Sequence, residues 1–179
     1  MTLPPPPPAV PGDDKDWTWV LQRPCPDCGY DAAAVDRAQV GAAVRETAAS
    51  WGPVLERPDA SIRPDTGTWS PLEYACHVRD VLRLYDERLR LMLDQDDPLY
   101  ANWDQDATAV EGRYDLQDPT RVAGEVLAAA EQVAPAFDGL TGEQWERRGR
   151  RSDGAHFTVD TFARYFLHDL VHHRHDVRG

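Results

Sequence analysis

One segment of the sequence, residues 70–93, constrains the fold more than any other, because it carries both a helix start signal and a long apolar stripe. Ser70 and Pro71 supply an N-cap and a first-turn proline, and Glu73 takes the capping-box position three residues after the serine. Apolar side chains then recur at steps of three and four residues, as on the buried face of an α-helix. The stripe consists of Tyr74, His77, Val78, Val81, Leu82, Tyr85, Leu89 and Met92. A histidine therefore lies on the buried face of this predicted helix.

Three more segments have the composition or the spacing of helices. Residues 31–51 are rich in strong helix formers, residues 118–135 begin with an aspartate and a proline, and residues 159–177 contain neither glycine nor proline. A long acidic connection at residues 94–118 separates the second predicted helix from the third. The strand signal is poor, and residues 147–156 are expected to form a turn-rich loop. The pattern predicts an all-α bundle of four main helices.

The first thirty residues differ from the rest of the chain. Residues 1–16 contain six of the fifteen prolines and are expected to form a flexible tail, because polyproline segments bury little surface. Residues 17–30 mix aromatic and turn residues without a helical period, and are expected to dock as an extended arm. Residues 31–179 have the length of one domain. We therefore expect one helical domain with an N-terminal arm and tail.

The charge of the chain argues against several classes of partner. The 19 basic and 31 acidic residues give a net charge of −12, which would repel nucleic acids and anionic membranes. No stretch approaches the roughly 18 consecutive apolar residues of a membrane span. The three cysteines cannot all pair with one another and no secretion signal opens the sequence, which favours a reducing compartment. The chain is expected to be cytoplasmic, to be a monomer or homodimer, and to bind neither nucleic acid nor membrane.

Five of the six histidines lie within the last 24 residues, and two of them have the spacing of metal ligands. His168 and His172 are four residues apart on a predicted helix, so they point about 40° apart and lie one turn from each other. Together with His77 they make three protein ligands, the pattern of an open catalytic metal site. His175 is the substitute ligand, whereas His173 is expected to point elsewhere. The alternatives are a solvated helix end for the cluster and a hydrogen-bonded core histidine for His77.

Cys25 and Cys28 form a C-x-x-C pair in the predicted arm. Such a pair can hold a metal or cycle as a dithiol, but the local sequence supplies only half of a zinc site, and no strand precedes it as in a redox motif. A structural turn with free thiols or a disulfide is the third interpretation, so the role of the pair stays open. Cys76 is expected to be a small core residue, because it points about 100° away from His77.

Two further groups of side chains are candidates for a site. Trp103, Asp104 and Asp106 lie in the long connection, where they could form a wall over the metal or pack as an ordinary loop. The only dense basic patch could bind a carboxylate or a phosphate, or be a solvated loop. It consists of Arg147, Arg148, Arg150 and Arg151. Phosphate-binding glycine loops, serine-hydrolase elbows and H-E-x-x-H motifs are absent, so those activities have no local support.

The motifs WSPLEYACHVRDV and HDLVHHRHDV resemble the DinB-like superfamily, which includes the metal-binding domain of mycothiol-dependent maleylpyruvate isomerase and related thiol-dependent transferases. The resemblance covers about residues 30–177. It implies an up-down-down-up four-helix bundle with a long connection between helices two and three, and a divalent metal at His77, His168 and His172. The isomerase branch uses a glutamate as the first ligand of the last-helix pair, where this chain has His168.

These observations lead to two hypotheses about function. The first is a divalent-metal-dependent enzyme that activates a thiol or water against a small electrophilic substrate. Zn²⁺ is the expected metal, with Ni²⁺, Fe²⁺ or Mn²⁺ as alternatives. The resemblance implies an S-transferase that uses a low-molecular-weight thiol such as mycothiol. The second hypothesis is a non-catalytic metal-binding or stress-associated interaction module, because the sequence identifies neither a catalytic nor a cofactor-binding side chain.

Overall fold

The computed structural model describes residues 7–8, 10 and 15–179 of the chain. The tail predicted at residues 1–16 falls largely outside these residues, and its flexibility stays a prediction. The arm begins with a short 3₁₀ helix, η1 (Trp17–Leu21), whose start is capped because the amide of Thr18 donates a hydrogen bond to Asp16 over 2.9 Å. The expectation of a wholly extended arm was therefore wrong for this stretch.

Helix α3 (Pro71–Asp94) starts at the capping box predicted from the sequence. The amide of Glu73 donates to the hydroxyl of Ser70 over 3.2 Å, and the amide of Ser70 donates back to the Glu73 carboxylate over 2.9 Å. Arg63 pairs with the same carboxylate and fixes the preceding loop. The predicted apolar stripe is buried except for the half-buried Tyr74, and it includes His77, which is 1% exposed.

The other long helices also begin at caps supplied by the sequence. Helix α5 (Pro119–Asp138) follows Asp118, whose side chain accepts a hydrogen bond from the amide of Arg121. Helix α6 (Val159–Asp176) follows Thr158, which caps its first turn. The first predicted helix is shorter than expected. Two 3₁₀ turns occupy much of residues 31–39, and α1 (Val40–Ala49) and α2 (Trp51–Leu55) follow them.

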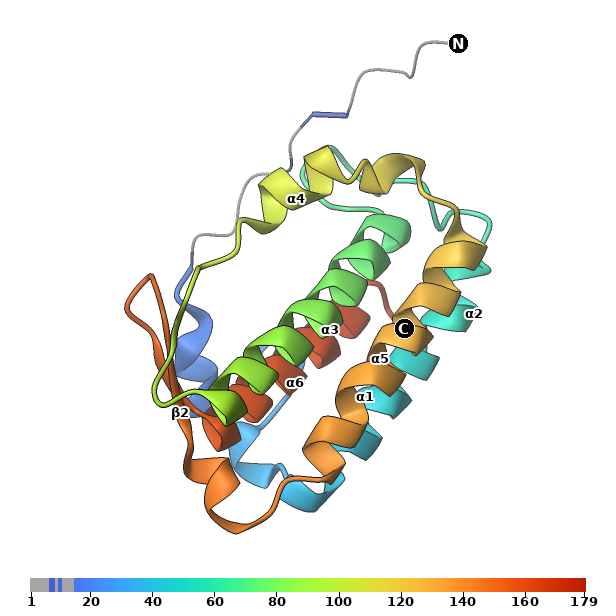
Figure 1. Ribbon diagram of the computed structural model, residues 1–179. Coiled ribbons are helices and arrows are strands. Elements are labelled where there is room, and N and C mark those ends of the chain that lie inside the picture. The colour runs from blue at the N-terminus through green and yellow to red at the C-terminus, as the bar shows by residue number, and fades with distance from the viewer. Residues whose placement is uncertain (1–6, 9, 11–14) are drawn as a thin grey trace.

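These helices form a bundle around one apolar core. Helix α1 packs against α5 and α6, and α3 packs against the same two helices (Figure 1). The core contains large side chains from all of them, among them Val44, Trp51, Leu82, Leu89, Val126, Phe137, Phe162 and Phe166. In the described part of the chain, no helix is long and apolar enough to cross a membrane.

A small sheet, which the sequence did not predict, lies at one side of the mostly helical bundle. Its strands are β1 (Leu99–Tyr100), β2 (Arg148–Arg151) and β3 (His156–Thr158), with β1 parallel and β3 antiparallel to β2. The segment predicted to be a turn-rich loop is therefore a hairpin. The sequence hides it because β2 is mostly arginine, a residue without strand preference, and its pairing with β1 comes from a distant part of the chain.

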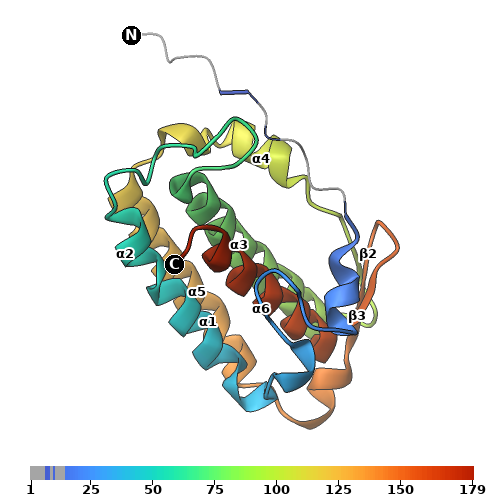
Figure 2. The ribbon, with the colours of Figure 1, turned by 180° about the vertical axis from the view of Figure 1, so that it is seen from behind.

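The connection between α3 and α5 returns along the bundle to the end where α3 begins. It passes through β1 and then forms α4 (Gln105–Glu111) and the 3₁₀ turn η4 (Tyr114–Leu116), both of which contact α3 (Figure 1). The N-terminal arm lies on another side, where η1 contacts α6 (Figure 2). The connection therefore borders α3 and the arm borders α6, and these are the two helices that carry the candidate ligands.

Candidate metal centre

Helix α6 carries two pairs of ligand-type side chains that are interleaved by one residue. His168 and His172 form one pair, and Asp169 and His173 form the other. Because consecutive residues of a helix point about 100° apart, the two pairs lie on neighbouring faces. Each pair meets a different part of the chain, so α6 contributes to two clusters of potential metal ligands.

The first cluster joins α3 and α6 through His77, Asp169 and His173. One ligand atom from each lies within 4.8 Å of the others. The Nε2 atom of His77 is 3.5 Å from Oδ1 of Asp169, and Nε2 of His173 is 3.7 Å from the same oxygen. The rings of His77 and His173 have centroids 4.7 Å apart. Two imidazoles and a carboxylate thus converge on one point between two helices.

The buried atoms of this cluster lack hydrogen bonds. Neither ring nitrogen of His77 has a hydrogen-bond partner, and neither does Oδ1 of Asp169. Burial lowers the pKa of His77, which favours a neutral ring. Burial alone would raise the pKa of Asp169, but the neighbouring His77 and His173 lower it to about 2. A neutral imidazole and a charged carboxylate with unused lone pairs are the states that a divalent cation binds.

Aromatic side chains surround this cluster and line a cavity of about 980 Å³ beside it. Trp103 stacks on His77 with ring centroids 5.3 Å apart and a 15° angle between the planes. The ring centroid of Trp69 lies 5.5 Å from that of His77, and the ring centroid of Tyr74 lies 5.2 Å from that of His173. Asp169 and His173 also line the cavity. The cluster is therefore covered on one side and open to the cavity on the other.

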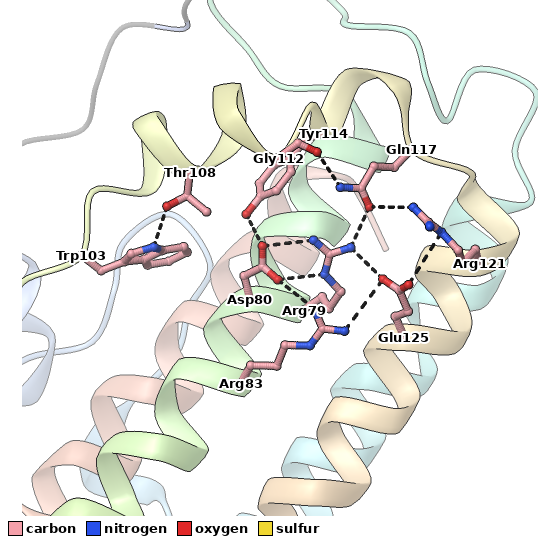
Figure 3. A network of polar contacts seen from close by, with 10 residues as sticks. All are labelled: Arg79, Asp80, Arg83, Trp103, Thr108, Gly112, Tyr114, Gln117, Arg121 and Glu125. Atoms are coloured by element: carbon pink, nitrogen blue, oxygen red, sulfur yellow. Dashed lines mark hydrogen bonds and ion pairs between the residues drawn. The ribbon is translucent and has the colours of Figure 1, made fainter.

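A polar network holds the connection that carries Trp103 against α3 (Figure 3). The hydroxyl of Tyr114 donates to Asp80, and Arg79 donates to the side-chain oxygen of Gln117 over 2.7 Å. Within the connection, Nε1 of Trp103 donates to Oγ1 of Thr108 over 2.8 Å. Trp103 thus has a fixed position over His77.

A wall over the metal was one of two interpretations of this connection, and Trp103, Asp104 and Asp106 all line the cavity. Asp104 also has a structural role, because its side chain caps α4 by accepting a hydrogen bond from the amide of Ala107. The three side chains thus line the cavity and also pack within the connection, and a role as a wall over a metal stays a prediction.

The second cluster joins the N-terminal arm to α6 through Cys25, Cys28, His168 and His172. The thiols are free. Burial raises the pKa of Cys28 to about 11 and lowers the pKa of His168 to about 4, so both groups are neutral at pH 7. Nε2 of His168 is buried without a hydrogen-bond partner.

The predicted triad is divided between these two clusters. His168 and His172 lie together, with ring centroids 5.0 Å apart, and His77 lies with Asp169 and His173. Among the described residues, His77 does not lie within 4.8 Å of both His168 and His172 in any one group of potential ligand atoms. The triad itself stays a prediction. The expectation that His173 points elsewhere was wrong, because its ring packs on His77.

The remaining candidates have mostly structural partners. Arg147 donates to the carbonyl of Met92, and Arg150 pairs with Asp97 over 3.0 Å. Arg151 pairs with Asp153 and lines the cavity. Three arginines of the basic patch thus form hydrogen bonds and ion pairs that hold the β-hairpin in place. His175 is exposed, and Cys76 is fully buried in the core as predicted.

Comparisons with known proteins identify the family. A model of the DinB superfamily matches residues 55–177, more than half of the chain, and the chain therefore belongs to this superfamily. Among solved structures, the chain is similar to YfiT from Bacillus subtilis, described as a probable metal-dependent hydrolase with an unusual four-helix bundle topology. The similarity has a TM-score of 0.69 at 18% identity and covers 78% of this chain and 82% of YfiT. No curated protein matches the chain.

Proposed function

We propose that this protein is a divalent-metal-dependent enzyme whose catalytic ion is held by His77, Asp169 and His173, on a bundle of up-down-down-up topology. One observation carries the proposal: Nε2 of His77 and Oδ1 of Asp169 are buried and face each other across two helices at 3.5 Å, too far apart for a hydrogen bond of normal length. A buried polar atom without a partner costs about 1–3 kcal/mol, and a bound cation would remove that cost. The metal dependence ascribed to YfiT supports the same conclusion.

Three protein ligands leave coordination positions open to a substrate or co-substrate. A bound ion such as Zn²⁺ lowers the pKa of a coordinated thiol or water and so makes it a nucleophile at neutral pH. The pair Asp169 and His173 places a carboxylate first and a histidine four residues later. This order resembles the glutamate-first pair that the sequence analysis associated with the isomerase branch, and we therefore propose a low-molecular-weight thiol, such as mycothiol, as the co-substrate.

The side chains around the cluster determine what can approach it. Trp69 and Trp103 cover His77 and exclude water from its ring. Farther along the cavity, Arg88 is 6% exposed and donates a hydrogen bond to the carbonyl of Ala101. Among the described residues, no carboxylate forms an ion pair with Arg88. A buried guanidinium without a counter-ion favours an anion, so we propose a small electrophilic substrate that carries a carboxylate.

The proposal predicts a specific pattern of lost activity. Protein purified without a histidine tag and loaded with metal is assayed against small electrophiles, with and without a carboxylate and with and without an added thiol. Asp169→Asn and His173→Ala should each reduce the rate on the order of 100-fold or more, because each removes one of three ligands. His175→Ala, at an exposed position on the same helix, is the matched control and should keep full activity.

Other outcomes distinguish the alternatives. If His168→Ala and His172→Ala abolish the reaction while Asp169→Asn and His173→Ala do not, the ligands are those of the triad predicted from the sequence. If no electrophile reacts although the metal site is fully loaded, a non-catalytic metal-binding module replaces the enzyme. If rates with and without thiol are equal and water is consumed, the enzyme is a hydrolase rather than a thiol transferase.

A further inference from the structure

We propose that the protein has a second metal site, a structural zinc site built by Cys25 and Cys28 of the N-terminal arm with His168 and His172 of α6. The four side chains each offer one ligand atom, and these atoms all lie within 4.8 Å of one another. The site is separate from the cluster around His77 and does not rest on the function proposed for it.

The four ligand types and their spacing fit zinc. Two thiolates and two imidazoles are a common ligand set of closed tetrahedral zinc sites. With Zn–S and Zn–N bonds of about 2.3 and 2.0 Å, a sulfur and a nitrogen at two corners of the tetrahedron lie about 3.5 Å apart. The Sγ atom of Cys25 lies 3.7 Å from Nδ1 of His172. The thiol and the imidazole are thus already near the separation that one shared ion requires.

The backbone around the cysteines forms a tight turn suited to two ligands. The amide of Gly29 donates to the carbonyl of Cys25 over 2.9 Å, and the amide of Cys25 donates to the carbonyl of Tyr30 over 2.8 Å. Gly29 has a φ of +74°, in the left-handed region that side chains disfavour. The turn therefore closes directly after Cys28 and keeps both thiols, which are not joined in a disulfide, beside the same helix.

The two histidines have the surroundings of fixed ligands. Nε2 of His168 is buried and makes no hydrogen bond, so a lone pair is available. For His172, Nδ1 faces Cys25 while Nε2 lies 3.7 Å from Asp176. At this distance Asp176 makes no hydrogen bond to His172, but its negative charge raises the basicity of the ring that would bind the ion.

Packing of the arm supports a structural rather than a catalytic ion. Trp17 lies against the rings of His168 and His172, with centroids 5.5 and 5.1 Å away. Tyr30 packs on His168 from the other end of the arm, and its hydroxyl donates to the carbonyl of Arg164 over 2.7 Å. Four protein ligands leave no open position on the ion. The ion would therefore fasten the arm to α6.

The arm in turn contributes to the cavity. Trp17, Thr18 and Asp27 line it together with residues of the bundle. Fastening the arm thus completes one wall of the proposed active site. The second site accounts for the C-x-x-C pair, whose role the sequence left open.

The test begins with the unmodified chain, so it does not depend on a variant that folds. Protein purified under argon without a histidine tag is stripped of metal, titrated with Co²⁺ and examined by absorption spectroscopy and metal analysis. Thiolate ligation should give an intense near-ultraviolet sulfur-to-cobalt charge-transfer band, and zinc should displace it. Absence of this band at saturating Co²⁺ would overturn the proposal, as would a Cys25–Cys28 disulfide in the argon-purified protein.

Variants then assign the ligands. Cys28→Ala should lose the charge-transfer band and one equivalent of zinc per chain, whereas Cys76→Ala, which removes the third thiol, should keep both. His77→Ala should keep the band, which separates failure of the cavity site from failure of this one. If the wild type binds a single equivalent of zinc per chain and both His77→Ala and Cys28→Ala abolish it, the chain has one shared site and the proposal is wrong.

The rate at which a protease cuts the arm gives an independent test of the zinc site. Trp19 lies in η1, six residues before Cys25, and is followed by a valine, so chymotrypsin should cut after Trp19 slowly in the zinc-loaded protein and at least tenfold faster after treatment with a strong chelator. Cys28→Ala should be cut at the fast rate with or without chelator. Equal rates for loaded and stripped wild-type protein would contradict a zinc-fastened arm.

Discussion

His172 and His173 are adjacent in the chain, and their ring centroids lie 5.9 Å apart, yet each ring faces a different cluster. Nδ1 of His172 lies 3.7 Å from the thiol of Cys25 on the arm. The ring of His173 packs on His77 of α3. Since neighbouring residues of a helix diverge by about 100°, two turns of α6 present two pairs of ligand-type side chains to two separate clusters. The arm and α3 are thereby tied to the same helix.

The close approach of α1 and α5 gives the first prediction. A Cβ atom at Gly41 would lie 2.9 Å from the carbonyl oxygen of Ala134 and 2.0 Å from Asp138, so Gly41→Ala forces the two helices apart. We expect a loss of about 1–3 kcal/mol in the free energy of unfolding, measured by urea denaturation. Gly124→Ala in α5 is the control. No atom beyond its chain neighbours and the backbone of its own helix turn lies within 4 Å of the added Cβ, so the change should be neutral or stabilise by up to about 1 kcal/mol. Equal effects of both changes would contradict the close contact.

The capping box of α3 gives the second prediction. Ser70→Ala removes the oxygen that accepts a hydrogen bond from the amide of Glu73, and should cost about 1 kcal/mol of stability. Ser61→Ala, at an exposed position in the preceding loop, should change the stability by less than about 0.5 kcal/mol in the same denaturation experiment. A neutral Ser70→Ala would mean that the helix starts elsewhere and that the position of His77 is not set by this cap.

Removal of metal gives the third prediction, which rests on both proposed sites. A ligand that binds only the folded state raises its stability, so a chelator should lower the thermal midpoint of the zinc-loaded protein by several degrees. In Cys28→Ala the shift should be smaller, because one of the two ions is already lost. Scanning calorimetry with matched apo and loaded samples measures both shifts. An unchanged midpoint in the wild type would argue against tight binding at either site.

Local signals predicted much of the fold, because they act within a few residues. Ser70 with Glu73, and Asp118 with the proline after it, marked the starts of α3 and α5, and both starts are confirmed. The hairpin could not be predicted in this way. Its strand β2 is held by pairing with β1, some fifty residues away, and by aromatic neighbours such as Phe157 beneath Arg151.

The candidate site shows where local reasoning ends. The last helix contains two interleaved pairs with the same spacing, His168 with His172 and Asp169 with His173. Spacing alone cannot choose between them, because the choice depends on how α6 is rotated about its axis against α3. The signal that was overlooked is the second pair, Asp169 and His173, which places a carboxylate first and a histidine four residues later. Likewise, nothing near Cys25 indicates that the arm folds back onto the histidines almost 150 residues later.

The last prediction concerns pH and the network that holds the connection over the site. Burial alone would raise the pKa of Asp80, but hydrogen bonds from Arg79 and Tyr114 lower it below its usual value of 3.8. The charged carboxylate therefore stabilises the folded state fully above that value, and the contribution is lost as the pH falls through the lower folded-state pKa. At pH 7, Asp80→Asn should cost about 1.5–3 kcal/mol, because it removes charge-assisted hydrogen bonds. The difference between Asp80→Asn and the wild type should shrink below about pH 4 in urea denaturation. As a control, Asp59→Asn changes an exposed carboxylate, and its free energy of unfolding should differ little from that of the wild type at either pH. If the loss of stability in Asp80→Asn stays constant down to pH 2.5, the Asp80 carboxylate is not what holds the connection in place.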